Sequence, residues 1–179
     1  MSGGDARLAV KVRRAKGRDL EEYAKRLQSV ADEGRYLFTE TVTEEMKKSL
    51  ARLFKDKGAL AIVAEVGGKR KKIVGSLTLI RYGHVKKASH VRVLGMLVIK
   101  EYRGLGIGTK LIVYALEWVK SHEEIEKIIL GVFSNNRKAL RLYEKFGFEV
   151  EGIKKRQYYI AGKHEDEIEM ALFLKRPSS

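Results

Sequence analysis

The sequence contains no cysteine and only one proline among its 179 residues. The lack of cysteine excludes disulfide bonds, thiolate metal ligands and a cysteine nucleophile that would carry an acyl group. No apolar run approaches the roughly 18 residues that a membrane-spanning helix needs. The first residues, 1–5, also lack the apolar core of a secretion signal. These absences predict a cytoplasmic protein without a membrane partner.

The composition is that of a folded chain with a sizeable core, since 44% of the residues are hydrophobic and 34% are charged. We expect a single domain over residues 1–179, with flexible ends at 1–6 and 175–179. The formal charge of +14 has two interpretations: a nucleic-acid partner, or a solvated basic surface that partly faces a polyanionic ligand. The basic residues are spread, are dense only at 69–72, and are not interleaved with stacking aromatic residues. We therefore expect no nucleic-acid partner.

Hydrophobic periodicity predicts strands and helices that alternate along the chain. Strands are predicted at 8–13, 60–66, 73–80, 91–99 and 128–133, followed by two strands within 148–174. Helices are predicted to begin near Asp19, Thr43, Gly106 and Asn136. No repeat or linker interrupts this order, so the pattern predicts one α/β (α+β) domain.

A glycine-rich turn, residues 100–109, joins the strand at 91–99 to the helix that follows it. Alternate glycines leave backbone amides uncovered, and the helix N-terminus adds free N–H groups and a positive dipole end. We therefore expect an anion, above all phosphate, to bind here. The spacing matches neither a P-loop nor a dinucleotide fingerprint, because Arg103 and Thr109 occupy positions at which those motifs require glycine.

The remaining pattern, Arg103-x-x-Gly106-x-Gly108, resembles the pyrophosphate loop of the GNAT superfamily of acetyl-CoA-dependent N-acetyltransferases. A second stretch, residues 136–148, resembles the signature N-x-x-A-x-x-L-Y-x-K-x-G-F of the same superfamily. The two motifs are separated by one predicted helix and one predicted strand, as in that superfamily. Together they carry the resemblance over residues 91–148.

The resemblance implies a mixed, mostly antiparallel central sheet of about seven strands with flanking helices. In this fold the sheet is splayed between two parallel strands, here those at 91–99 and 127–133, and the pantetheine arm of acetyl-CoA lies in the opening. Gly95 within the first of these strands predicts a bulge that separates the two.

The resemblance also implies where the cofactor binds. Backbone groups of Met96, Leu97 and Val98 would hold the pantetheine arm and polarise the thioester oxygen. Asn136 and Ala139 would contact the cofactor as well, although Asn136 is also an adequate helix N-cap on its own. The residues implied to cradle the pyrophosphate are Arg103, Gly104, Leu105, Gly106, Ile107, Gly108 and Thr109.

Tyr143 stands where the family places its general acid, against the cofactor's sulfur. A phenol is matched well enough to a thiolate to protonate it. Alternatively, Tyr143 is a core aromatic residue on the apolar face of its helix.

The sequence does not identify the general base. Some relatives place a glutamate twelve residues before the catalytic tyrosine, but this sequence has Gly131 there. Glu33 and Glu40 are candidates, since they fall where the family builds its acceptor pocket. His90 and His164 are further candidates, and an ordered water chain would need no single base.

The predicted function is transfer of an acetyl group from acetyl-CoA to a primary amine by direct attack in a ternary complex. The acceptor stays open between a small amine, an amino acid, and a protein lysine or N-terminus. The alternatives are a basic nucleic-acid-binding module and a CoA-sensing module without turnover. The four histidines lack metal-ligand spacing, so we expect no metal. A monomer and a homodimer are both open.

Overall fold

A computed structural model of the chain describes residues 9–68, 71–83 and 86–174. The expected flexible ends, 1–6 and 175–179, and part of the basic cluster at 69–72 lie outside these residues. Over the described residues the strands are β1 (Val10–Arg14), β2 (Leu60–Val66), β3 (Lys72–Arg81), β4 (Val91–Val98), β5 (Lys127–Phe133), β6 (Glu149–Ile160) and β7 (Lys163–Phe173). The helices are α1 (Leu20–Ala31), α2 (Glu44–Leu53), α3 (Ile107–Lys120) and α4 (Arg137–Lys145), with short 3-10 turns η1 (Gly17–Asp19), η2 (Lys86–Ala88) and η3 (Lys100–Tyr102).

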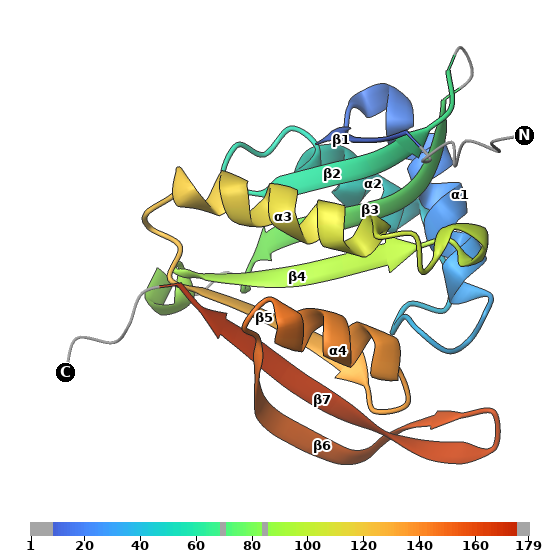
Figure 1. Ribbon diagram of the computed structural model, residues 1–179, viewed down its shortest axis with the longest axis vertical. Helices are drawn as coiled ribbons and strands as arrows, with labels where there is room; N and C mark the ends of the chain where they lie inside the picture. Colours follow the sequence, from blue (N-terminus) through green and yellow to red (C-terminus); the bar gives the residue numbers. More distant parts are fainter. Residues whose placement is uncertain (1–8, 69–70, 84–85, 175–179) are drawn as a thin grey trace, which may run out of the picture.

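The seven described strands form one sheet in the order β1-β2-β3-β4-β5-β7-β6. Neighbouring strands are antiparallel except β4 and β5, which are parallel. Helices α3 and α4 lie on one face of this sheet, and α1 and α2 lie on the other (Figure 1). The predicted mixed, mostly antiparallel sheet with flanking helices is therefore confirmed.

The sheet is splayed between β4 and β5, as predicted. The two strands pair over only three positions, from Val91 opposite Lys127 to Val93 opposite Ile129, and then separate. The predicted bulge at Gly95 is wrong: β4 runs in unbroken register with β3, and Gly95 lies opposite Thr78. The splay instead develops because β5 leaves β4 and stays paired with β7 over its whole length.

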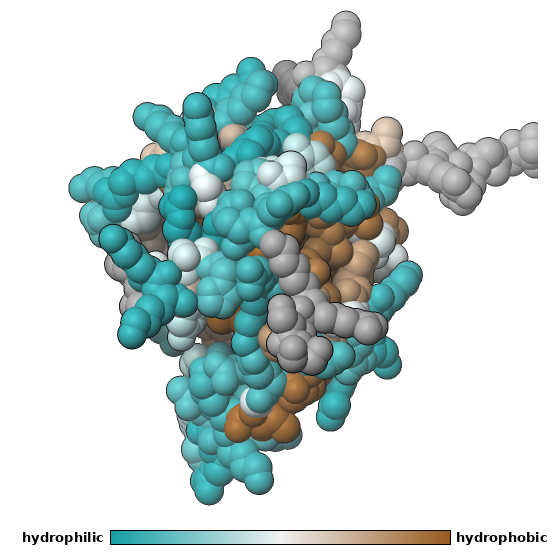
Figure 2. Space-filling view, turned by 90° about the vertical axis from the view of Figure 1, so that its left-hand side faces the viewer, coloured by the Kyte–Doolittle hydropathy of each residue, from teal (hydrophilic) through white to brown (hydrophobic). Residues whose placement is uncertain are grey.

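The main core lies between the sheet and α3. Strand β2 is buried along its whole length, and Leu111, Ile112 and Ala115 of α3 are at most 1% exposed. Figure 2 shows one face of the molecule, on which hydrophilic side chains cover most of the surface and hydrophobic ones gather in a smaller band. The buried sheet therefore provides a rigid frame for the splayed strands.

Candidate active site

The free edge of β4 presents backbone groups to the opening beside β5. The N–H of Ile99 donates to the carbonyl of Val74 at 3.0 Å, and the N–H of Tyr82 donates to the carbonyl of Val91 at 3.3 Å. Because backbone groups alternate along a strand, the odd-numbered residues of β4 face β3, and Met96 and Val98 face the opening. The backbone of Leu97 faces β3, so the geometry does not support the expected cofactor contact from Leu97.

The glycine-rich turn exposes its backbone next to this edge. Gly104 and Gly106 have φ values of +78° and +76°, which side chains other than glycine's adopt only with strain. A Cβ at either position would meet no heavy atom within 4 Å, so the space above both glycines is open. Gly106 is the N-cap of α3, and the first N–H groups of a helix have no intrahelical acceptor. The turn is thus an open, positively polarised seat for an anion.

Arg103 holds this turn to the rest of the protein. Its Nε donates to the carbonyl of Val98 at 2.8 Å, and its two terminal nitrogens donate to the Glu33 carboxylate at 2.7 and 2.5 Å. The guanidinium also lies over the ring of Tyr36, 4.6 Å from its centroid. The side chain predicted to contact pyrophosphate is therefore engaged with protein groups, and it fixes the position of the turn.

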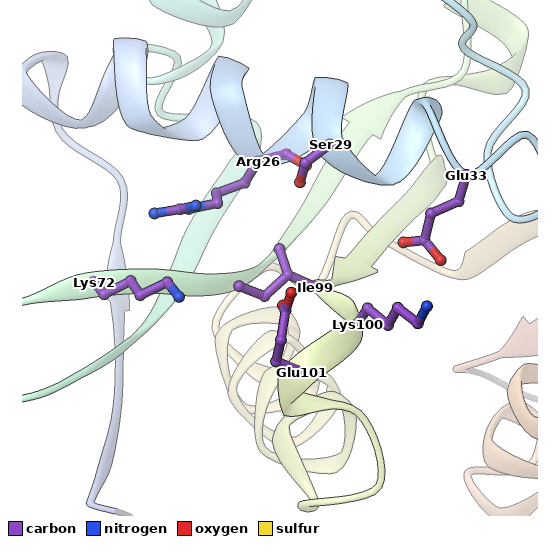
Figure 3. A pocket seen from close by; sticks show the side chains of 7 residues that line it. All are labelled: Arg26, Ser29, Glu33, Lys72, Ile99, Lys100 and Glu101. Atoms are coloured by element: carbon purple, nitrogen blue, oxygen red, sulfur yellow. The ribbon is translucent and has the colours of Figure 1, made fainter.

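Glu33 lies at the end of α1 and lines a small pocket of about 210 Å³ on the α1 side of the turn (Figure 3). Cationic side chains of Arg26, Lys72 and Lys100 line the same pocket. Glu33 is paired with Arg103, and Glu101 adds a second carboxylate to the pocket. The environment of Glu33 is that of a structural ion pair.

Tyr143 lies on α4 and is 7% exposed. Its ring contacts that of Phe148, with centroids 5.6 Å apart. Burial raises the pKa of the Tyr143 phenol above its ordinary value. The phenol therefore stays protonated at neutral pH, which is the form that a general acid needs.

Asn136 begins α4, and its side-chain oxygen accepts the N–H of Ala139 at 3.3 Å. The predicted N-cap is confirmed. Gly108 lets the two helices approach, because a Cβ there would lie 2.9 Å from Cδ2 of Leu142. The first turn of α3 therefore lies against the middle of α4.

A larger cavity of about 420 Å³ lies on the other face of the sheet, between the splayed strands and β7. Its walls include Val93, Gly131 and Tyr82, and Phe38 from the α1–α2 connection. Phe38 packs edge-on against Phe133 of β5 at a centroid distance of 4.8 Å. Since α4 covers the opposite face (Figure 1), this cavity and Tyr143 lie on the two sides of the sheet.

Three carboxylates, those of Glu151, Glu167 and Glu169, line this cavity. Glu151 is ion-paired with Lys127. The ammonium of Lys154 lies 2.7 Å from Glu169 Oε1 and 3.4 Å from Glu167 Oε1. Two carboxylates of the cavity wall therefore already hold one primary alkylammonium group.

The sequence-based candidates for the general base do not line this cavity. Glu33 is paired with Arg103. Glu40 is exposed, and its carbonyl accepts the side-chain amide of Gln28. His164 is exposed beside Tyr159, and the carbonyl of His90 accepts the N–H of Glu126 where β4 begins.

Sequence reasoning missed Glu167, Glu169 and Lys154. The signal that could have found the two glutamates is the alternation in the last strand, where acidic residues at 165, 167 and 169 interleave with apolar residues at 168, 170 and 172. Alternate residues of a strand share one face, so this pattern places the carboxylates together.

Two kinds of feature are absent from the described residues. No helix there is long and apolar enough to cross a membrane. No group of three or more His, Asp or Glu side chains in that part of the chain is arranged to hold a metal ion.

Comparison with known proteins gives consistent matches over most of the chain. The model of the Acetyltransferase (GNAT) family matches residues 21–148. A spermidine N(1)-acetyltransferase of Escherichia coli (strain K12) is 27% identical over 167 residues, which cover 92% of this chain and 86% of the relative. An L-amino acid N-acetyltransferase of the same organism is 31% identical over 120 residues, 67% of this chain and 72% of the relative.

Solved structures share the fold. An acetyltransferase of the GNAT family from Streptococcus pneumoniae matches with a TM-score of 0.82 and 26% identity, over 93% of this chain and 100% of that chain. The Salmonella typhimurium protein yncA, solved with its cofactor acetyl-CoA, matches with a TM-score of 0.84 and 17% identity, over 96% and 97% of the two chains. The family match includes the splayed strands, the glycine turn and α4. The chain therefore belongs to the GNAT family and is an acetyl-CoA-dependent N-acetyltransferase.

Proposed function

We propose that the enzyme acetylates a primary amine that enters as a cation through the cavity beside β7, and that the amine attacks acetyl-CoA directly in a ternary complex. The observation that carries this proposal is the ammonium of Lys154 between Glu167 and Glu169. A pocket wall that binds one alkylammonium suits another, whereas the carboxylate of an amino acid would be repelled by the same glutamates. A small diamine or polyamine is therefore the favoured acceptor.

The cofactor fits the opposite side of the opening. The backbone groups of Met96 and the N–H of Val98 face the splay and suit the amides of a pantetheine arm. The open turn from Gly104 to Thr109, at the N-terminus of α3, suits the pyrophosphate. Bound there, acetyl-CoA would supply the activated acetyl group.

Each protein group then has a chemical task. Backbone N–H groups at the free edge of β4 stabilise negative charge on the thioester oxygen. Tyr143 gives its proton to the departing sulfur, and its raised pKa keeps the phenol protonated until the sulfur leaves. Asn136 and Ala139, at the first turn of α4, lie against the cofactor. All of these groups come from one copy of the chain, so the proposed reaction needs only a monomer.

The test is acetyl-CoA-dependent thiol release with a panel of acceptors: spermidine, a simple diamine, an L-amino acid, a lysine-containing peptide and a free peptide N-terminus. We expect the highest kcat/KM with the diamine or spermidine. Higher kcat/KM with the amino acid or the peptides would contradict the cationic-amine assignment. No thiol release with any acceptor would instead favour a CoA-sensing module.

Calorimetric titration distinguishes the proposed enzyme from a nucleic-acid-binding module. We expect CoA to bind with an affinity that changes little between low and physiological salt. A DNA duplex should bind weakly, with an affinity that falls steeply as salt rises. Tight, sequence-dependent DNA binding at physiological salt would contradict the proposal.

A further inference from the structure

The carboxylate of Glu167 occupies the space that a side chain at position 131 of β5 would fill. A Cβ built on Gly131 would lie only 2.6 Å from Glu167 Oε1, closer than real side-chain contacts allow. Gly131 and the carboxylate of Glu167 therefore fit one another: the glycine makes room, and the glutamate of β7 fills the space. We infer that Glu167 is the general base that removes the proton from the acceptor amine. This inference rests on the proposed function.

The carboxylate of Glu167 lies at the point where the sheet opens. Glu167 pairs with Phe133 of β5, beyond the last position, Ile129, at which β5 contacts β4. Side chains of directly paired residues share one face of a sheet. Glu167 therefore faces the cavity that Phe38 covers, while Tyr143 lies on the other face. The base and the acid thus act from opposite sides of the opening.

The surroundings of Glu167 orient its carboxylate and bury most of it. Glu167 is 8% exposed. Tyr158 donates its hydroxyl to Glu167 Oε2 at 3.3 Å, and the rings of Tyr158 and Phe38 stack with centroids 5.1 Å apart. Phe133 packs edge-on against both rings. With Oε2 held by Tyr158, Oε1 is the oxygen directed to Gly131 and Lys154.

An irregularity in β6 brings both partners of Glu167 to it. The register between β6 and β7 shifts between Lys154, opposite Glu167, and Tyr158, opposite Glu165. Arg156 within the shift has a φ of +54°, and its N–H donates to Asp166 Oδ1 at 2.7 Å. Bulges of this kind re-aim side chains and are frequent beside active sites. Here the bulge places Lys154 and Tyr158 around a single carboxylate.

Lys154 marks the position that the acceptor nitrogen would take. Its Nζ lies 3.4 Å from Glu167 Oε1, and its side chain is 44% exposed. The side chain can therefore swing into solvent when an acceptor ammonium replaces it between Glu167 and Glu169. The groups that face Glu167 from neighbouring elements are Lys154 and Tyr158 of β6, Glu169 of β7 and the uncharged ring of Phe38.

Glu167 and Tyr143 take part in the proton transfers of the reaction as follows. The acceptor ammonium gives a proton to Glu167, and the nitrogen lone pair forms the new C–N bond to the acetyl carbon. The C–S bond breaks, the departing sulfur takes the proton of Tyr143, and the nitrogen of the new amide releases its second proton to solvent. Solvent then removes the proton from Glu167 and returns one to Tyr143.

The decisive variant is Glu167→Gln, which keeps the shape of the side chain and its acceptor for the Tyr158 hydroxyl. We expect kcat with the best acceptor of the panel to fall about 100- to 10,000-fold, as for loss of a general base, with the affinity for CoA unchanged. Glu165→Gln is the matched control, because Glu165 lies two residues away on the same strand and bonds Ser134; it should keep kcat within about twofold. A Glu167→Gln enzyme that binds CoA normally and keeps wild-type kcat would overturn the inference.

Two rescue experiments distinguish a chemical role of Glu167 from a structural one. Added formate should recover part of the turnover lost in Glu167→Ala, because a small carboxylate can enter the vacated space. The double variant Glu167→Ala with Gly131→Glu returns a carboxylate from β5, and it should be at least tenfold more active than Glu167→Ala alone. Failure of both restorations in a protein that still binds CoA would assign Glu167 a structural role. If the wild-type enzyme released no thiol with any amine, the proposed function itself would fail instead.

Discussion

The guanidinium of Arg103 and the carboxylate of Glu33 meet through two hydrogen bonds of 2.7 and 2.5 Å, although 70 residues separate them in the sequence. The same guanidinium reaches the carbonyl of Val98 at 2.8 Å. One side chain thus joins the end of α1, the end of β4 and the glycine turn. This link makes the anion seat dependent on α1, which lies apart from the glycines that form it.

Glu33→Ala should therefore weaken cofactor binding without removing the base. We expect a raised KM for acetyl-CoA, a loss of stability of about 1–3 kcal/mol from the broken charged hydrogen bonds, and turnover within a few-fold of wild type. Glu45→Ala serves as control, because Glu45 also pairs with an arginine, Arg52, but lies on α2. If turnover instead fell by about two orders of magnitude while KM stayed unchanged, Glu33 would be identified as a base.

Tyr143→Phe should lower kcat by about 100- to 10,000-fold, because it removes the proton that the departing sulfur takes. The dissociation constant for CoA, measured by calorimetry, should change by less than a few-fold. Tyr159→Phe, at a tyrosine that is 70% exposed on β6, provides the control. Equal losses of turnover and of CoA affinity would show that the ring of Tyr143 acts in binding or packing.

The pH dependence of turnover should reflect the buried phenol. Because burial raises the pKa of Tyr143, the protonated, active form persists to higher pH than for an ordinary tyrosine, whose pKa is about 10. We expect kcat to show no decline from Tyr143 ionisation up to about pH 10. A decline well below that pH that is absent from Tyr143→Phe would contradict this assignment.

Gly106→Val should abolish CoA binding, since the side chain would occupy the open space over the turn. Part of any effect will be backbone strain, which costs about 1–2 kcal/mol for a left-handed residue. Gly162→Val is a matched control: Gly162 has a φ of +80° and equally open surroundings, but lies in the β6–β7 turn. We expect both variants to lose similar stability and only Gly106→Val to lose CoA binding. Unchanged CoA affinity in Gly106→Val would refute the anion seat.

Asp19 should make the fold sensitive to acid. Burial by itself would raise the pKa of Asp19, but hydrogen bonds from Arg13 and from the N–H of Lys16 outweigh it and lower the pKa. A carboxyl group with a lowered folded-state pKa stabilises the protein above its unfolded value of about 3.9 and loses that contribution as pH falls through its folded value. Thermal midpoints should therefore fall below about pH 4 in the wild type. They should fall less steeply in Asp19→Asn, while the exposed-site control Glu149→Gln should follow the wild type.

The sequence by itself predicted the secondary structure and the motifs to which the cofactor contacts are assigned. Alternating and helical patterns located the strands and helices, since burial of one face imposes a local period. The glycine turn and the helix that Asn136 begins were also readable, because an N-terminal anion seat and an N-cap depend on residues only a few positions apart. The bulge expected at Gly95 was wrong. A lone glycine in a strand indicates that a side chain would not fit there, but it does not show whether a bulge is the reason.

Only the tertiary structure brought together the residues of the proposed acceptor side. Glu167 and Gly131 are 36 positions apart in the chain, and nothing in either neighbourhood indicates that the carboxylate of one occupies the space left by the other. Arg103 and Glu33 likewise meet only when α1 packs across the end of β4. The register of β7 against β5 and the shift in β6 fix these contacts, and register depends on the whole set of strand pairings. Local sequence therefore specifies the elements, while the site between them is specified by how they pair.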